Sequence, residues 1–191
     1  MTNLLFTGRL WSRDEVLATR SPVPKEPGVY AWYFRSVPPG VPTEGCVQHG
    51  SHILLYVGIA PKAPPRNGAK PSTQRLFHRI RYHYRGNAEG STLRLTLGCL
   101  LSEELGLVLR RVGSGKRFTF SDGENRLSDW MGKNAFVAWS VDPEPWTLEK
   151  DLIARLSLPL NLDQNTTHPF HRRLSALRRK AKQQARSLPV A

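Results

Sequence analysis

Hydrophobic and polar residues follow one another along this chain in patterns that predict three strands. Two runs of β-branched, aromatic and aliphatic residues, GVYAWYF at 28–34 and ILLYVGI at 53–59, are typical of buried strands. A third run, NAFVAWSV at 134–141, predicts another strand. Prolines and glycines crowd the segments 37–50 and 61–72, which we therefore expect to be loops.

Apolar residues at helical spacing predict amphipathic helices between and after these strands. In 75–85 the apolar side chains form one stripe and basic residues lie on another side. Further helices are expected at 91–105, 145–156 and 166–186, with a short helical turn at 128–133. Residues 107–120 are expected to form a β-hairpin around Gly113 and Gly115. The order of elements predicts one α/β domain with loop insertions and a basic C-terminal helix.

Positive charge is concentrated in two segments. Lys and Arg number 28 and Asp and Glu 15, which gives a net charge of +13 with neutral histidines. Segment 62–94 holds eight basic residues and one acid, and segment 172–186 holds seven basic residues and no acid. Such a charge favours phosphate-rich partners, although a solvated helix face is the alternative for either run. Charge alone does not separate nucleases from ribosomal adaptors or membrane-surface proteins.

Cysteine usage and the lengths of the apolar runs indicate an intracellular protein. Cys46 and Cys99 are far apart and form no CxxC pair, so neither a disulfide framework nor a thiolate zinc site is indicated. The first fifteen residues lack the pattern of a secretory leader, and the apolar runs are far shorter than the roughly 20 residues that cross a bilayer. We expect a cytoplasmic protein, free or associated with the nucleoid, without membrane attachment.

Short motifs on the first two predicted strands are more specific. The first strand opens on GVY at 28–30, and the second contains YVG at 56–58. This pair resembles the motifs of the GIY-YIG nuclease superfamily, found in homing endonucleases, excision-repair endonucleases and some restriction enzymes. That family continues with a helix of the form Leu-x-x-Arg-x-x-x-His/Tyr, which Leu76, Arg79 and His83 match in spacing.

The resemblance continues through the later part of the chain. The family places a Glu at the start of a later helix and an Asn shortly beyond a Pro, as Glu149, Pro159 and Asn161 do here. It implies a stand-alone catalytic domain with a β-β-α-α-β-α core at 26–165, a central sheet of three mainly antiparallel strands flanked by helices, and a basic helix at 166–187. Insertions relative to the family are expected at 36–51, 60–74 and 107–133.

The resemblance also implies a hydrolytic site. Glu149 would hold Mg²⁺ or Mn²⁺, and Arg79 would offer its charged guanidinium to the phosphate. His83, one helical turn beyond Arg79, could relay or donate a proton. Tyr30 would activate the attacking water, with Tyr56 positioning the phosphate or sharing that duty. A tyrosine pKa near 10 requires a nearby cation for this role, which the metal and Arg79 would supply.

Other residues are expected to support this chemistry. Asn161 would hold Glu149 or a backbone strand in place, and Gly28 and Gly58 are the structural glycines of the two motifs. The basic residues expected to contact nucleic acid are Lys62, Arg66, Lys70, Arg75, Arg81, Arg85, Arg172, Arg173, Arg178 and Arg179. We expect an endonuclease acting on DNA more than on RNA, with low sequence specificity or recognition of a DNA structure, and no obligate protein partner.

Two other interpretations remain open at this point. The chain could be a non-catalytic nucleic-acid-binding protein that keeps the fold and charge, or a protein of ribosomes or anionic membranes. Each candidate also has a common structural role, since strand tyrosines usually pack and arginines on basic helices are usually solvated. Trp130, Trp139 and Trp146 are expected in the core or in the wall of a groove.

Overall fold

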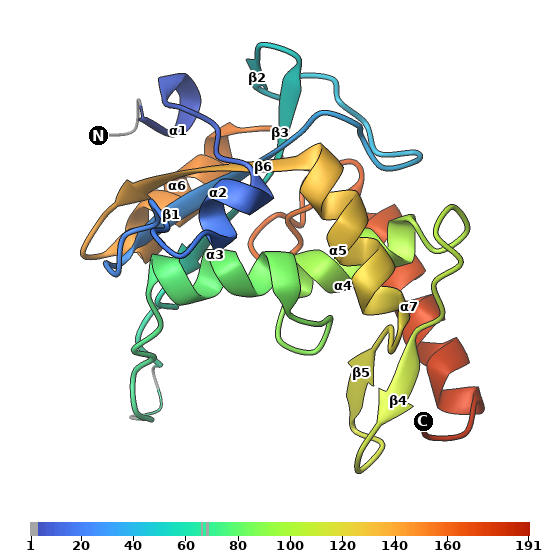
Figure 1. Cartoon of the computed structure of the whole chain (residues 1–191). Coiled ribbons are helices and arrows are strands. Elements are labelled where there is room, and N and C mark those ends of the chain that lie inside the picture. The colour runs from blue at the N-terminus through green and yellow to red at the C-terminus, as the bar shows by residue number, and fades with distance from the viewer. Residues whose placement is uncertain (1–3, 66, 68) are drawn as a thin grey trace.

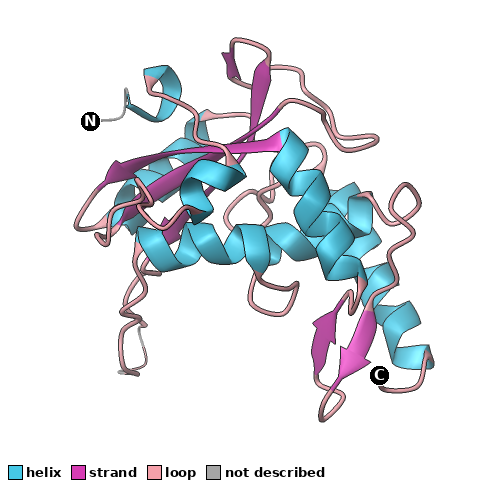
Figure 2. Ribbon diagram, in the orientation of Figure 1, coloured by secondary structure: helices cyan, strands magenta, loops and turns pink. Residues whose placement is uncertain are grey.

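A four-stranded sheet with helices on both faces organises the protein (Figures 1 and 2). The structure, a computed structural model, describes residues 4–65, 67 and 69–191. The strands are β1 (Gly28–Phe34), β2 (Gln48–His49), β3 (His52–Ala60) and β6 (Ala135–Val141), in the spatial order β2-β3-β1-β6. Every pairing in this sheet is antiparallel. The expected mixed α/β fold with a central antiparallel sheet is confirmed.

The expected count of three strands is wrong by one, because β2 adds a short edge strand from the first proline- and glycine-rich segment. A turn at Gly50, whose φ of 59° suits glycine, reverses the chain into β3. β2 pairs only with Ile53 and His52 at the start of β3. The outer edge of β3 beyond these residues is therefore left for another segment of the chain.

Helices form layers on the two faces of the sheet (Figure 1). The helices are α1 (Leu4–Thr7), α2 (Arg13–Leu17), α3 (Leu76–Arg85), α4 (Thr92–Leu100), α5 (Gly123–Asn134), α6 (Pro145–Arg155) and α7 (His171–Ser187). α6 packs on β1 and β3, and α1 packs on β6. α3 contacts β1 and β3, α5 contacts β6, and α2 packs against α3 and α5. α4 packs against α7. No helix in the described ranges is long and apolar enough to cross a bilayer.

Both faces of β1 are buried, which explains its unbroken apolar sequence. Trp32 and Phe34 point into the larger core cluster with residues of α3, α4 and α5. Ala31 and Tyr33, on the opposite face, belong to a second cluster with residues of α6. The period of two along the strand thus sends alternate side chains to two cores, and Tyr30 shares the face of Trp32.

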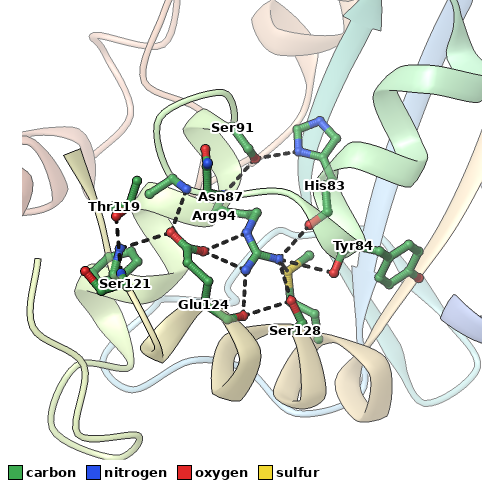
Figure 3. Close-up of polar contacts among 12 residues, drawn as sticks. His83, Tyr84, Asn87, Ser91, Arg94, Thr119, Ser121, Glu124 and Ser128 are labelled. Carbon is green, nitrogen blue, oxygen red and sulfur yellow. Dashed lines mark hydrogen bonds and ion pairs between the residues drawn. The ribbon is translucent and has the colours of Figure 1, made fainter. Parts of the chain in front are cut away.

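The helices differ in length from their predicted ranges. α4 ends at Leu100 rather than at residue 105, and turns lead from there to Gly106, whose φ is 58°. The short turn expected at 128–133 is part of the twelve-residue α5. The first turn of α5 is fixed by Glu124, whose carboxylate pairs with the buried Arg94 of α4 (Figure 3). The predicted hairpin is confirmed as β4 (Arg110–Val112) and β5 (Arg117–Thr119).

Candidate active site

A cavity of about 560 Å³ beside β1 and β3 brings together five of the six side chains expected to perform or support chemistry. They come from β1, β3, α3, α6 and the segment that follows α6. These five are Tyr30, Tyr56, Arg79, Glu149 and Asn161. His83 is absent from the lining and lies fully buried behind Tyr30.

Asn161 closes the edge of β3 that β2 leaves open. Its amide Nδ2 donates to the carbonyl of Val57 and its Oδ1 accepts from the amide of Val57, both at 2.9 Å. The backbone amide of Leu160 also donates to the carbonyl of Leu55. The side chain of Asn161 thus replaces a neighbouring strand and fixes the segment 161–164 at the rim of the cavity. It holds a strand in place, and not Glu149.

The hydroxyl of Tyr30 lies at the centre of a polar chain. Its oxygen is 2.9 Å from Nε2 of His83, and Nε of Arg79 donates to it at 3.3 Å. Gly58 pairs with Tyr30 across the sheet, and a Cβ atom at Gly58 would lie 2.6 Å from this hydroxyl oxygen. The glycine of the YVG motif therefore makes room for the Tyr30 hydroxyl at the edge of the cavity.

His83 connects Tyr30 to the start of α4, where Figure 3 shows its contact with Ser91. Its Nδ1 is 2.7 Å from the hydroxyl of Ser91, which also accepts from the amide of Arg94 as the N-cap of α4. Among the described residues Ser91 has no third partner, so its O–H is satisfied only by donating to Nδ1. His83 then carries its proton on Nε2 and donates to Tyr30.

Burial lowers the pKa of His83 well below its usual value, and the nearby charges of Arg79 and Arg94 add to this effect. The ring is therefore neutral near pH 7. Its placement favours orienting Tyr30 over direct proton donation to a substrate. Tyr30 in turn has a pKa raised by burial, which the charge of Arg79 opposes.

Arg79 is held by the protein at two of its three nitrogens. Nη1 donates to the carbonyl of Gly90 at 2.7 Å, and Nε donates to Tyr30. Nη2 makes no hydrogen bond to any described residue, and Arg79 lines the cavity. The guanidinium is thus oriented in advance, with donor capacity left for a phosphate oxygen.

Glu149 brings a carboxylate into the cavity from α6. Burial raises its pKa to about 7, with a further contribution from the negative charge of Asp163, while Lys62 acts in the opposite direction. Asp163 and Lys62 line the same cavity. Repulsion between two carboxylates in one cavity is what a divalent cation relieves, and Mg²⁺ takes one or two carboxylates together with water and phosphate oxygens.

Glu149 therefore fits a divalent ion in its chemistry and surroundings. The described residues contain no group of three or more His, Cys, Asp and Glu side chains able to hold a metal by themselves. Water and substrate oxygens would have to complete the shell, as is usual for Mg²⁺ at phosphate sites.

Tyr56 completes the cavity from β3. The residue is 9% exposed, and its hydroxyl has no hydrogen bond to any described residue. Its pKa is raised well above the usual value by burial and by the neighbouring Tyr30. A nearly buried phenol facing a polar cavity without a protein partner is free to bind water or a phosphate oxygen.

A family model of the GIY-YIG catalytic domain matches residues 28–180, which is most of the chain. The protein belongs to the GIY-YIG family. Membership implies a nuclease-type function on a nucleic-acid substrate, and divalent metals are typical of the family. No curated protein and no solved structure matches the chain at a significant level.

Basic residues around the α3 helix of this GIY-YIG domain have different environments. Lys62 lines the cavity, and Lys70 and Arg85 are exposed. Arg75 is partly buried at the start of α3. Arg81 donates to the carbonyls of Val16 and Ala18, which ties α3 to the N-terminal segment. Arg66 lies outside the described residues.

Basic residues on α7 divide between two sides of that helix. Arg178 and Arg179 line a groove next to the cavity. Arg173 lines a separate depression with Glu103 and lies over the ring of Phe170. Arg172 is exposed at the start of the helix. The four arginines expected to contact nucleic acid therefore do not form one surface.

Several residues of the GIY-YIG cavity had no signal in the sequence. Thr92, Lys150, Asp163 and Gln164 line the cavity, but none belongs to a motif. The adjacency of Lys150 to Glu149, and of Asp163 to Asn161, was the only available indication. Among the tryptophans, Trp146 lines the cavity and Trp130 lies in the core, whereas Trp139 stacks on Trp11 with ring centroids 5.6 Å apart.

Proposed function

We propose that this protein is a metal-dependent endonuclease that hydrolyses phosphodiester bonds in DNA. The observation that carries the proposal is the convergence of Tyr30, Arg79 and Glu149 on one cavity from three different elements. A phosphoryl site needs positive charge for the phosphate, a base for the attacking water and stabilisation of the leaving oxygen. The residues of this cavity offer a group for each need.

The phosphate would be held by cations. Arg79 presents Nη2, and Lys62 and Lys150 line the same cavity. A divalent ion at Glu149, which we propose to be Mg²⁺ or Mn²⁺, would supply Lewis-acid stabilisation of the charge on the phosphate and leaving oxygen. Tyr56, with its unpartnered hydroxyl, would orient the phosphate or the attacking water.

Tyr30 would take the proton from the attacking water. Its oxygen receives N–H donors from His83 and Arg79, so its own proton is left to face the cavity. Once that proton has passed to solvent in the cavity, the phenolate can accept a proton from the attacking water, and the same two donors stabilise the phenolate. Burial raises the Tyr30 pKa, and the positive charge of Arg79 lowers it. Positive charge gathered at the phosphate would lower it further and bring the base closer to neutral pH.

DNA is proposed as the substrate because the motifs resemble those of DNA endonucleases. The net charge of +13 supports a polyanionic substrate in general. Cys46 and Cys99 are free, which suits the reducing cytoplasm where we propose that the protein acts.

The test is cleavage of single- and double-stranded DNA and of RNA, with Mg²⁺, with Mn²⁺ and with EDTA. We expect metal-dependent cleavage of DNA that falls at least about 100-fold in Glu149→Gln and Arg79→Ala. Glu144→Gln, at the exposed start of α6, is the matched control and should cleave like wild type. Binding without cleavage under every condition would identify a non-catalytic binding protein and overturn the proposal.

A further inference from the structure

A groove lined by cations leads away from the active-site cavity along α7. Four of its residues are Arg178, Arg179, Lys182 and Arg186, and its volume is about 640 Å³. Residues 162–164 line both this groove and the cavity that holds Glu149. The two hollows therefore share a rim, and a ligand can pass from one into the other without leaving the protein surface.

The β4–β5 hairpin, which packs against α7, extends this surface. Lys116 and Phe118 of the hairpin line an adjoining depression together with Arg178 and Lys182. The ring of Phe118 lies 5.8 Å from Nζ of Lys182 and 5.7 Å from Cζ of Arg186. These cation–π contacts hold the two charged groups over the hairpin and reduce the entropy lost when they bind an anion.

Positive charge in this groove is not neutralised by ion pairs. The ion pairs found in the described residues involve none of these four cations. Asp163 lies only at the junction with the cavity, and the carboxylate of Glu89 accepts from the amide of Phe118 at 2.8 Å. A concave surface with unpaired cations attracts a polyanion.

The spacing of the cations suits a chain of phosphates. Arg178, Lys182 and Arg186 follow one another at every fourth residue of α7 and line the same groove. They span about 12 Å at the helical rise of about 1.5 Å per residue. One strand of nucleic acid advances about 3.4 Å per nucleotide in a duplex, so this length corresponds to about three to four nucleotides.

We propose that the α7 groove, defined by Arg178, Arg179, Lys182 and Arg186, binds the phosphate backbone of the substrate strand on one side of the scissile phosphate. The proposal rests on the proposed nuclease function, because it takes the cavity as the position of the cut. Backbone contacts of this kind carry no base information. Lys182 and Arg186 also lie beyond residue 180, where the match to the family ends.

The test compares two double substitutions on the same helix. Lys182→Gln with Arg186→Gln removes one Lys and one Arg from the α7 groove. Arg173→Gln with Lys180→Gln removes the same residue types from the separate depression that contains Glu103. Each pair contains an arginine that lies over a phenylalanine ring, so the loss of that arginine's packing is matched, and Lys182 adds a second contact with Phe118 to the groove pair. Thermal unfolding of each variant checks that the fold is retained.

Binding is measured by fluorescence anisotropy in EDTA with labelled single-stranded and duplex DNA over a series of salt concentrations. The groove variant should bind about tenfold or more weakly at ~0.1 M salt, and its slope of log K against log salt should fall by about 1.4 to 1.8, for two lost phosphate contacts. The control variant should change the slope by less than half as much. Equal effects in both variants, or none in the groove variant, would overturn the proposal.

A second measurement uses DNA strands that extend by zero to six nucleotides on either side of the cut. With wild type, kcat/KM should increase with length on one side only and level off after about three to four nucleotides. The groove variant should lose this length dependence and keep kcat at saturating DNA. Length dependence that persists unchanged in the variant would contradict the groove assignment. If wild type never cleaves, the proposed function fails, while the anisotropy comparison still tests the groove.

Discussion

Nε2 of His83 lies 2.9 Å from the hydroxyl oxygen of Tyr30, and both residues are fully buried. The contact joins α3 to β1, and Ser91 extends it to the first turn of α4. Because Ser91 donates to Nδ1, the ring must donate from Nε2. The tautomer of a buried histidine is thus set by the cap of a neighbouring helix, and it decides whether Tyr30 receives or gives a hydrogen bond.

Substitution of Ser91 tests this relationship. In Ser91→Ala the ring can adopt the Nδ1–H tautomer, so Tyr30 loses a donor to its phenolate and its pKa rises. We expect kcat to fall by about tenfold. The limb of the pH–rate profile on which activity increases with the ionisation of Tyr30 should move to higher pH. Loss of the cap should also cost about 1 kcal/mol of stability. Ser91→Thr, which keeps the hydroxyl, should restore the pH profile; an unshifted profile in Ser91→Ala would contradict the assigned tautomer.

Gly58→Ala tests the room that the sheet leaves for Tyr30. The added Cβ would lie 2.6 Å from the Tyr30 hydroxyl, so this side chain must move away from His83 and Arg79. We expect cleavage to fall by about 100-fold or more, because small displacements of a catalytic group are costly. Gly132→Ala is the control, since its Cβ would meet only the flexible side chain of Arg13. Wild-type activity in Gly58→Ala would show that the position of the Tyr30 hydroxyl is unimportant.

Glu149 should make the stability of the protein depend on pH. Its pKa rises from the ordinary 4.5 to about 7 on folding. Below pH 4.5 the carboxyl is protonated in both states and contributes nothing. Between pH 4.5 and pH 7 the folded state keeps a proton on Glu149 that the unfolded state has lost, so the free energy of unfolding falls as pH rises. Above pH 7 the carboxyl is ionised in both states, and its destabilising contribution no longer changes with pH.

Glu149→Gln removes this penalty. The variant should exceed wild type in stability by about 1–3 kcal/mol at pH 8 and by little at pH 4.5, as measured by urea unfolding in EDTA. Added Mg²⁺ at pH 8 should stabilise wild type and have much less effect on Glu149→Gln, because Glu149 is the proposed ligand and only the carboxylate of Asp163 remains in the cavity. The same substitution at the exposed Glu104 controls for the loss of one charge. A pH-independent difference would show that Glu149 ionises freely in the folded protein.

Most of the motif residues could be predicted because they lie on strands or helices whose apolar pattern is unambiguous; Asn161, in the segment after α6, is the exception. Tyr30 and Arg79 are expected in the site because the motifs that contain them resemble those of the GIY-YIG family. β2 could not be predicted, since a two-residue strand has no periodicity. Asp163 reaches the cavity only because Asn161 fixes the segment after α6 against β3, and that contact spans 104 residues of sequence.

Charge was the least reliable guide to position. Arg94 belongs to the first basic segment, yet its side chain is fully buried. A count of charges cannot distinguish a solvent-exposed arginine from a buried one such as Arg94, whose partner Glu124 lies 30 residues further along the chain. Arg178 and Arg173 likewise belong to one basic run, but they line different hollows.

The Arg94–Glu124 pair gives a final prediction, on stability. Arg94 donates to both the carboxylate and the carbonyl of Glu124 and to the carbonyls of His83 and Tyr84, so it joins α5 to the end of α3 (Figure 3). Arg94→Met leaves these acceptors and a nearly buried carboxylate without a partner, at an expected cost of about 3–5 kcal/mol in urea unfolding.

Neutralising the carboxylate should recover part of that loss. Glu124→Gln keeps an oxygen to accept from the amides of Ala88 and Phe120. The double variant with Arg94→Met should therefore be more stable than Arg94→Met alone, because no buried charge remains unpaired. Asp151→Asn, which breaks the exposed pair with Arg155, should cost less than about 0.5 kcal/mol. A double variant that is less stable than Arg94→Met would show that the carboxylate of Glu124 stabilises the fold independently of Arg94.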